Sequence, residues 1–303
     1  MIYTITFNPA LDYVIKQRNF QKGQINRSEE EYILPGGKGI NVSIILKELD
    51  IDSTALGFIS GFVGNEIERK VREYGIKTDF IKIENDNSRI NVKILEPDKE
   101  TAINSKGPLI NEKYTELLYK KIGEIKEGDT LILSGSIPKG IKIDVYENIC
   151  KKIENKNVKI IIDATGDLLL KTLKYNPFLI KPNQEELEEI FNVKISNQDE
   201  AIKYAKKLQK KGAKNVLVSL GSIGTVFIDE DGYYYKRKSL NEKKIVNTVG
   251  AGDSMVAGFV AGYELFHNYE NALKMGIAAA TATVNSIFLA NKEEIYKFLD
   301  KMQ

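Results

Sequence analysis

The feature of this 303-residue chain that most constrains its fold is a series of four near-continuous apolar runs. They are Thr130–Leu133, Val158–Ile162, Phe178–Ile180 and Val216–Ser219. Runs of this kind fit strands that are buried on both faces of a parallel sheet. Helical segments separate them, at Val145–Ile153, Glu185–Phe191 and Asp199–Lys211. The alternation predicts an α/β fold, a doubly wound and mostly parallel sheet with helices on both faces.

The rest of the chain continues this pattern. Strands are predicted at Ile2–Phe7 and Thr54–Phe58, the second followed by a glycine-containing loop, Gly61–Gly64. Helices are predicted at Asn41–Leu49, Asn65–Tyr74 and Tyr114–Ile125. A late helix rich in Ala and Thr, Gly276–Leu289, is expected to be buried.

Two segments interrupt the alternation. Glu30–Leu34 and Arg89–Leu95 have strand character without crossover helices, and Thr101–Asn104 is a candidate third strand. We expect them to pair antiparallel in a small sheet outside the main layer, a lid formed from segments near 8–35 and 88–105. The alternative is that they are edge strands of the main sheet.

Composition excludes several classes of function. The chain has 44 basic and 42 acidic residues, a net charge of +2, so we expect neither a nucleic-acid nor a membrane partner. The single histidine, His267, excludes a histidine-rich metal site. The single cysteine, Cys150, suits a reducing compartment. With no targeting segment or membrane span apparent, we expect a cytoplasmic protein.

The sharpest motif is a glycine-rich segment, Asn247–Met255, between a predicted strand, Lys244–Val246, and a helix of small residues, Ser254–Leu265. Glycines let the backbone approach an anion, and a helix start directs free N–H groups toward it. Asp253 would repel a bound phosphate, so it makes better sense as a base that takes a proton from an attacking hydroxyl. The alternative is that Asp253 caps the helix.

A second glycine-rich segment, Leu34–Val42, also leads from a strand into a helix. Three glycines surround Lys38, and Asn41 lies in the first helical turn, so this segment could cradle a polar substrate. It lacks the Gly-Lys-Ser/Thr ending of a Walker A loop. The alternative is a tight turn with an exposed lysine.

Two other segments have a functional and a structural interpretation. In Lys181–Glu186, the Asn183 and Glu186 side chains share a helical face and could hold a hydrated magnesium ion, or could form a capping box. Ser219–Gly224 could wrap a nucleotide or simply turn a hairpin into Thr225–Ile228. No Gly-x-Gly-x-x-Gly follows the first strand, which argues against a dinucleotide dehydrogenase.

The order of these motifs resembles the ribokinase-like (pfkB-type) carbohydrate kinase family over essentially the full chain. The two family signatures match Gly36–Val42 and Asn247–Asp253. Within the family the chain is similar to the phosphosugar branch. The residues that carry this similarity are Asn8–Asp12, Ile25–Arg27, Arg89–Lys93 and Ser134–Pro138.

The resemblance implies a single ribokinase-like domain over residues 1–303 that uses ATP and Mg²⁺ to phosphorylate a ketohexose phosphate. Fructose 1-phosphate is the first candidate, and tagatose 6-phosphate and fructose 6-phosphate are the alternatives. The implied partners are the phosphosugar, ATP and a second copy of the chain, because lids in this branch commonly meet in a homodimer. A non-catalytic sugar-phosphate sensor is the alternative from another class, and the intact Asp253 argues against it.

The resemblance also assigns roles to residues. It makes Asp253 the base, and it makes the anion hole from Gly250, Ala251 and Gly252. The positions that match sugar binding are Asp12, Gly37, Lys38 and Asn41, and those near the substrate phosphate are Arg27, Arg89 and Ser136. The positions that match nucleotide and magnesium binding are Lys181, Asn183, Glu186, Ser219, Gly221, Gly224, Gly252 and, in the adenine pocket, Asn285. One departure concerns residues 285–291, which contain no glycine, so no potassium site is expected.

Overall fold

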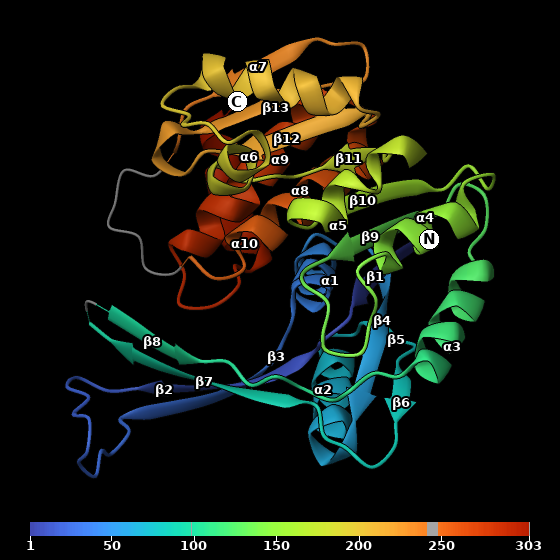
Figure 1. Ribbon diagram of the computed structural model, residues 1–303. Helices are drawn as coiled ribbons and strands as arrows, with labels where there is room; N and C mark the ends of the chain where they lie inside the picture. The colour runs from blue at the N-terminus through green and yellow to red at the C-terminus, as the bar shows by residue number, and fades with distance from the viewer. Residues whose placement is uncertain (98, 241–247, 303) are drawn as a thin grey trace.

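The computed structural model describes residues 1–97, 99–240 and 248–302. Its main sheet has the strand order β14-β13-β12-β11-β10-β9-β1-β4-β5, and β6 pairs with β4 (Figure 1). The strands are β1 (Ile2–Thr6), β4 (Ser53–Ser60), β5 (Lys77–Thr78), β6 (Ile81–Ile83), β9 (Thr130–Ser134), β10 (Lys159–Asp163), β11 (Leu179–Ile180), β12 (Asn215–Ser219), β13 (Thr225–Ile228) and β14 (Tyr234–Arg237). The four apolar runs are therefore β9 to β12, and the predicted parallel sheet is confirmed.

Helices cover both faces of this sheet. In β9, Leu131 and Leu133 belong to the apolar cluster that includes α3 and α4, whereas Ile132 belongs to the cluster of α1, α8, α9 and α10. Alternate side chains of one strand thus reach opposite layers, which explains the continuous apolar run and makes the fold doubly wound. The helices are α1 (Lys38–Glu48), α2 (Gly61–Glu73), α3 (Glu112–Gly123), α4 (Val145–Ile153), α5 (Gly166–Leu170), α6 (Gln184–Phe191), α7 (Gln198–Lys210), α8 (Ala251–Phe266), α9 (Tyr269–Val284) and α10 (Lys292–Leu299).

Three local predictions need correction or fall outside the description. Gly61–Gly64 is the first turn of α2 rather than a loop, because Gly61 takes a φ of 61° and turns the chain directly from β4 into the helix. The late helix ends at Val284, so the residues after Asn285 form a loop. The strand predicted at Lys244–Val246 lies outside the described residues.

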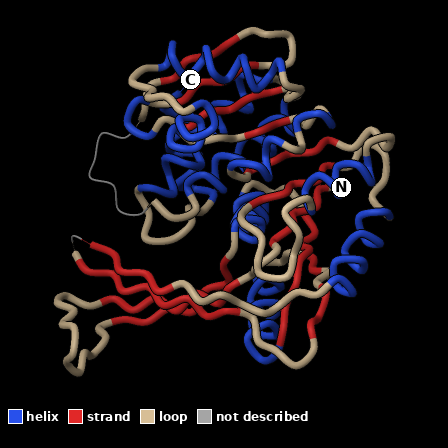
Figure 2. The backbone as a smooth tube through the Cα atoms, in the orientation of Figure 1, coloured by secondary structure: helices blue, strands red, loops and turns tan. Residues whose placement is uncertain are grey.

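A separate four-stranded sheet, called here the small sheet, has the order β3-β2-β7-β8. Its strands are β2 (Ala10–Lys16), β3 (Glu30–Gly36), β7 (Arg89–Glu96) and β8 (Lys99–Ile103). It extends away from the body of the molecule (Figures 1 and 2). The edge-strand alternative is therefore wrong.

The pairing within the small sheet differs from the prediction at one place. β2–β3 and β7–β8 are antiparallel, but β2 and β7 are parallel, from Ala10 opposite Arg89 to Lys16 opposite Leu95. The chain passes through α1, β4 and α2 between these strands, so it returns to the base of the small sheet before β7 begins. The strand β2 itself was not among the predicted strands.

The carboxyl ends of three adjacent strands lie together beside the small sheet. Thr6 of β1, Ser134 of β9 and Asp163 of β10 are in register. The strand β1 lies between β4 and β9, so the strand order reverses here, and ligands of open α/β sheets bind at such a point. None of the helices in the described part of the chain is long and apolar enough to cross a membrane.

Candidate active site

The start of α8 brings a buried carboxylate to this edge of the sheet. Gly250 is the N-cap residue with a φ of 78°, and Asp253 follows in the first helical turn, only 5% exposed. Asn41 Nδ2 donates a hydrogen bond of 2.8 Å to Asp253 Oδ2. Because Gly250 occupies the cap position, the alternative in which Asp253 caps α8 is wrong.

Asp163 is a charged residue of the site that the sequence did not single out. It is 1% exposed, and its carboxylate lies 3.1 Å from Lys181 Nζ and 3.4 Å from Lys38 Nζ. Burial opposes its ionisation, but the two ammonium groups outweigh burial and hold the pKa of Asp163 below its ordinary value. A signal was present, because an Asp that ends a run of three isoleucines must lie at the carboxyl end of a buried strand.

The two carboxylates of the site have opposite electrostatic environments. Burial, and then the Asp163 charge, raise the pKa of Asp253 to about 6. Burial alone would lower the pKa of Lys38, but the Asp163 and Asp253 carboxylates raise it overall. Divergent pKa values of neighbouring groups are typical of acid–base sites. Asp253 thus has the affinity for a proton that a base at neutral pH needs.

The second glycine-rich segment packs against this cluster. Gly37 is the N-cap residue of α1 with a φ of 121°, and a Cβ on Gly39 would lie 2.7 Å from the carbonyl oxygen of Ile5. Only glycines therefore allow α1 to start against β1. Lys38 is half-buried with its ammonium group near Asp163, which contradicts the alternative of a tight turn with an exposed lysine.

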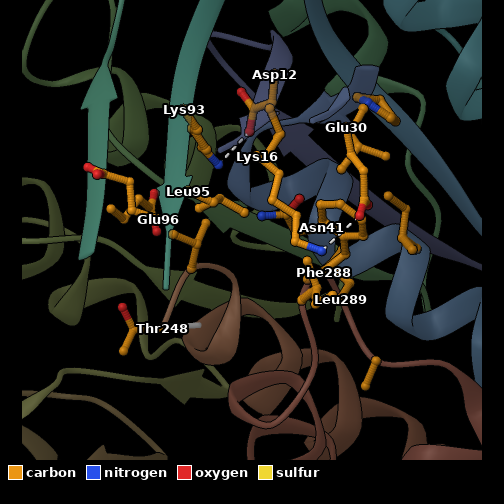
Figure 3. A pocket seen from close by; sticks show the side chains of 18 of the residues that line it. Asp12, Lys16, Glu30, Asn41, Lys93, Leu95, Glu96, Thr248, Phe288 and Leu289 are labelled. Carbon is orange, nitrogen blue, oxygen red and sulfur yellow. Dashed lines mark hydrogen bonds and ion pairs between the residues drawn. The ribbon is translucent and has the colours of Figure 1, made fainter. Parts of the chain in front are cut away.

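A cavity of about 960 Å³ opens between the small sheet and the body of the molecule (Figure 3). Asp12 and Lys93 line it from the small sheet, Asn41 from α1, and Thr248 and Leu289 from the C-terminal part. Asp12 Oδ2 lies 2.7 Å from Lys93 Nζ. The structure thus places two of the predicted sugar-binding residues, Asp12 and Asn41, on one cavity, and Asn41 also donates to Asp253.

The three residues predicted near the substrate phosphate are not brought together in one chain. Arg89 lies at the base of the small sheet, where its Nε donates to the Asn8 carbonyl oxygen at 3.1 Å. Ser136 lies in the loop after β9, one residue beyond Gly135, which packs against the Lys38 side chain. Arg27 is exposed in the loop between β2 and β3, at the far end of the small sheet.

The predicted nucleotide-binding residues lie at the neighbouring strand ends. A Cβ on Gly252 would lie 3.2 Å from Lys181 Nζ, so this ammonium group contacts the start of α8. Asn183 forms an isolated bridge with Ser219, which brings two of the predicted nucleotide positions together. The turn Gly221–Gly224 joins β12 to antiparallel β13, so the hairpin interpretation is correct as a description of the backbone.

The capping box at the start of α6 is present. Asn183 Oδ1 accepts from the Glu186 backbone N–H at 2.8 Å, and Glu186 Oε2 accepts from the Asn183 N–H at 2.9 Å. This arrangement uses the only side-chain oxygen of Asn183 and one of the two Glu186 oxygens, and it leaves Glu186 Oε1 for other contacts. Asn285, the predicted adenine-pocket residue, is the C-cap of α9, and its Nδ2 donates to the Thr281 carbonyl oxygen at 2.8 Å.

Comparison with known proteins identifies the family. The family model described as "pfkB family carbohydrate kinase" matches residues 6–294 of the chain. A 1-phosphofructokinase of Borreliella burgdorferi is 42% identical over 299 residues, which cover 99% of this chain and 96% of that protein. A D-tagatose-1-phosphate kinase of Bacillus licheniformis is 36% identical, with 100% of this chain and 99% of that protein covered.

A solved structure agrees with this assignment. Phosphofructokinase-2 from Escherichia coli in complex with fructose-6-phosphate superposes with a TM-score of 0.91 at 26% identity, covering 99% of this chain and 98% of that one. The chain therefore belongs to the pfkB family of carbohydrate kinases.

Proposed function

We propose that the protein transfers the γ-phosphoryl group of ATP to a ketohexose phosphate, above all converting fructose 1-phosphate into fructose 1,6-bisphosphate. The single observation that carries this proposal is Asp253, a buried carboxylate at the start of α8 that accepts a hydrogen bond from Asn41, a residue lining the cavity under the small sheet. The Borreliella burgdorferi relative, which matches the chain from end to end, supports the choice of substrate.

In the proposed mechanism, Asp253 takes the proton of the C6 hydroxyl while that oxygen attacks the γ-phosphorus. The bond between the γ-phosphorus and the β,γ-bridging oxygen breaks, and ADP leaves with that oxygen. The N–H groups of Gly250, Ala251 and Gly252 form the anion hole, because they lie at the positive end of α8. Lys181, held by Asp163 and touching Gly252, adds a fixed positive charge beside the transferred group. Phosphoryl transfer needs mainly such positioning and charge neutralisation.

Nucleotide binding is assigned to the strand ends next to this site. Lys181, Ser219 and the turn Gly221–Gly224 would hold ATP, with Asn285 toward the adenine. Asn183 and Glu186 would hold Mg²⁺ largely through water, since the capping box leaves Glu186 Oε1 available, and Mg²⁺ prefers few protein oxygens. When bound, the metal ion neutralises charge on the phosphates.

The substrate is assigned to the cavity under the small sheet, which would act as a lid on a single kinase domain spanning residues 1–303. Asp12 and Asn41, which line the cavity, would hold the sugar together with Gly37 and Lys38 at the start of α1. Burial lowers the pKa of the Arg89 guanidinium, so this cation would gain from an anionic partner such as the substrate phosphate. The cytoplasmic location remains a prediction from the sequence, and the lone Cys150 is compatible with it.

The proposal is tested by measuring ADP release with fructose 1-phosphate, tagatose 1-phosphate, tagatose 6-phosphate and fructose 6-phosphate under identical conditions. We expect the highest kcat/KM with fructose 1-phosphate. The Bacillus licheniformis relative makes tagatose 1-phosphate the second candidate acceptor. A higher kcat/KM on a tagatose phosphate would change the substrate but keep the kinase, whereas tight phosphosugar binding without ADP release would favour the sensor function.

A further inference from the structure

The Asp12 carboxylate is held on both oxygens by one neighbouring strand. Asn91 Nδ2 donates to Oδ1 at 2.8 Å, and Lys93 Nζ lies 2.7 Å from Oδ2. All three residues lie on the same face of the small sheet, because Asp12 is the register partner of Asn91 and Lys93 is two residues further along β7. This ion pair is among the interactions drawn in Figure 3.

The two donors are themselves fixed. The Asn91 side chain is buried, and its Oδ1 accepts from the Ser105 backbone N–H at 3.3 Å, so its amide nitrogen must face Asp12. The side chains of Lys93 and Asp12 are only 15% and 13% exposed. On the other side, a Cβ on Gly36 would lie 2.8 Å from Asp12 Oδ2, so the carboxylate rests directly on the backbone.

These contacts remove a freedom that an aspartate normally has. The terminal torsion of Asp is broad, so an unpartnered carboxylate can rotate to follow hydroxyl groups in different positions. Two donors from β7 fix the plane of the Asp12 carboxylate, and its remaining lone pairs then point in set directions into the cavity. A fixed acceptor discriminates between sugars that place one hydroxyl on opposite faces of the ring, because only one of them can donate to it.

We propose that Lys93 and Asn91 are positioning residues that fix the Asp12 carboxylate and so determine which ketohexose phosphate epimer the site prefers. The inference rests on the proposed function and deepens it, since it names the residues behind the preference for fructose 1-phosphate over tagatose 1-phosphate. Lys93 acts through Asp12, so its effect depends on the presence of the Asp12 charge.

The test compares Lys93→Met, Asp12→Asn and the double variant on both 1-phosphates. Lys159→Met is the matched control, because Lys159 also forms a half-buried ion pair, with Glu264 at 3.1 Å. Lys159 lies at the amino end of β10, whereas the candidate site lies at the carboxyl end. We expect Lys93→Met to raise the KM for fructose 1-phosphate about tenfold or more, to leave the KM for ATP within about twofold, and to cut the preference for fructose 1-phosphate about tenfold.

The double variant distinguishes positioning from direct contact. If Lys93 acts through Asp12, the double variant loses no more than about twofold in kcat/KM beyond Asp12→Asn. If the losses in kcat/KM multiply in the double variant, Lys93 binds the substrate by itself. If Lys93→Met leaves the preference between the two 1-phosphates unchanged, Lys93 does not determine selectivity. Either result overturns this inference and leaves the proposed function in place. A wild-type chain inactive on every ketohexose phosphate overturns the proposed function, and this inference with it.

Discussion

At the scale of single residues, the proposed base is Asp253. Its carboxylate is buried, and Asp163 lies near enough to raise its pKa further. We expect Asp253→Asn to keep ATP binding and to reduce turnover by roughly 10²–10⁴-fold, the usual contribution of a general base. Wild-type kcat should fall as the pH drops below about 6, where Asp253 becomes protonated. Near-normal turnover in the variant, measured where chemistry limits the rate, would contradict the assignment as base.

The same pKa shift predicts an effect on stability. The folded-state pKa of Asp253, about 6, lies above the ordinary value of 3.8, so the folded chain binds more protons than the unfolded chain between these values. The free energy of unfolding that this group contributes therefore falls as the pH rises through the window and stays low above it. Urea unfolding should show Asp253→Asn to be more stable than wild type at neutral pH, with the difference shrinking as the pH falls to about 4. A difference that does not vary with pH would contradict this account.

Arg89 tests how the substrate phosphate is recognised. Its guanidinium is half-buried, its Nε donates a hydrogen bond to the Asn8 carbonyl oxygen, and its burial favours a dianionic partner. A charge-assisted hydrogen bond contributes about 1.5–3 kcal/mol, so Arg89→Ala should raise the KM for the phosphosugar on the order of tenfold to a hundredfold, and the KM for ATP far less. Most of this loss should vanish with an unphosphorylated sugar as acceptor. An equal loss on both acceptors would point to a general defect of the small sheet.

Turning to whole elements, the start of α8 depends on a glycine that packs against the loop after α9. Gly250 has a φ of 78°, and a Cβ there would lie 2.5 Å from Leu289 Cδ2. Gly128 has a nearly identical φ of 79° with nothing within 4 Å, so Gly128→Ala measures the backbone cost alone. That cost is about 1–2 kcal/mol for a left-handed residue.

We therefore expect Gly250→Ala, which adds the clash with Leu289 to the backbone cost, to lose more stability than Gly128→Ala. Only Gly250→Ala should also lose turnover, by roughly tenfold or more, because a displaced anion hole weakens transition-state stabilisation. Adding Leu289→Ala to Gly250→Ala should recover part of the turnover by removing the clash. Steady-state kinetics and thermal unfolding of the four proteins measure this. Equal losses of turnover in the two glycine variants would show that packing against Leu289 is unimportant.

The elements also show what the sequence could and could not predict. The buried strands were predictable because burial on both faces leaves an unmistakable apolar run, as in β9. The strand β2 was not, because one of its faces carries polar residues such as Asp12 and Lys16 into a cavity and interrupts the pattern. The parallel pairing of β2 with β7 was not predictable either, since it depends on the path of the intervening chain rather than on local residues.

Across the whole molecule, sequence motifs and sheet register account for the positions of some predicted site residues but not of others. Lys38, Lys181 and Asp253 follow directly from motifs at strand ends, and the sheet register brings them together around Asp163. The predicted role of Arg27 at the substrate phosphate does not follow from the structure of one chain. Ala10 is the register partner of Arg89, and Lys16 at the other end of β2 is six positions further along the strand, a distance of about 20 Å. No arginine side chain spans that distance, so Arg27 cannot join Arg89 at the same phosphate within one chain.

The face of the small sheet opposite the cavity indicates how Arg27 could still reach a substrate phosphate. The cavity takes alternate residues of β2, so Tyr13 and Ile15 lie on the opposite face, along with Ile33 and Ile103, which are 44% and 61% exposed. An apolar sheet face of this kind is suited to pairing with a second copy of the chain. We predict a homodimer through the small sheets, in which Arg27 of one subunit approaches the substrate phosphate of the other. Sedimentation at several protein concentrations measures the association.

Mixing inactive variants tests the shared site. Arg27→Ala should lose phosphosugar binding, whereas Lys22→Ala, which removes another exposed cation of the same loop, should not. When Arg27→Ala and Asp253→Asn chains are unfolded together and refolded, each hybrid dimer contains one complete site, with Asp253 from one chain and Arg27 from the other. Half of randomly paired dimers are hybrids, so about a quarter of the wild-type activity should return. If Arg27 served its own subunit, or if the chain remained monomeric, the mixture would be no more active than its components measured apart.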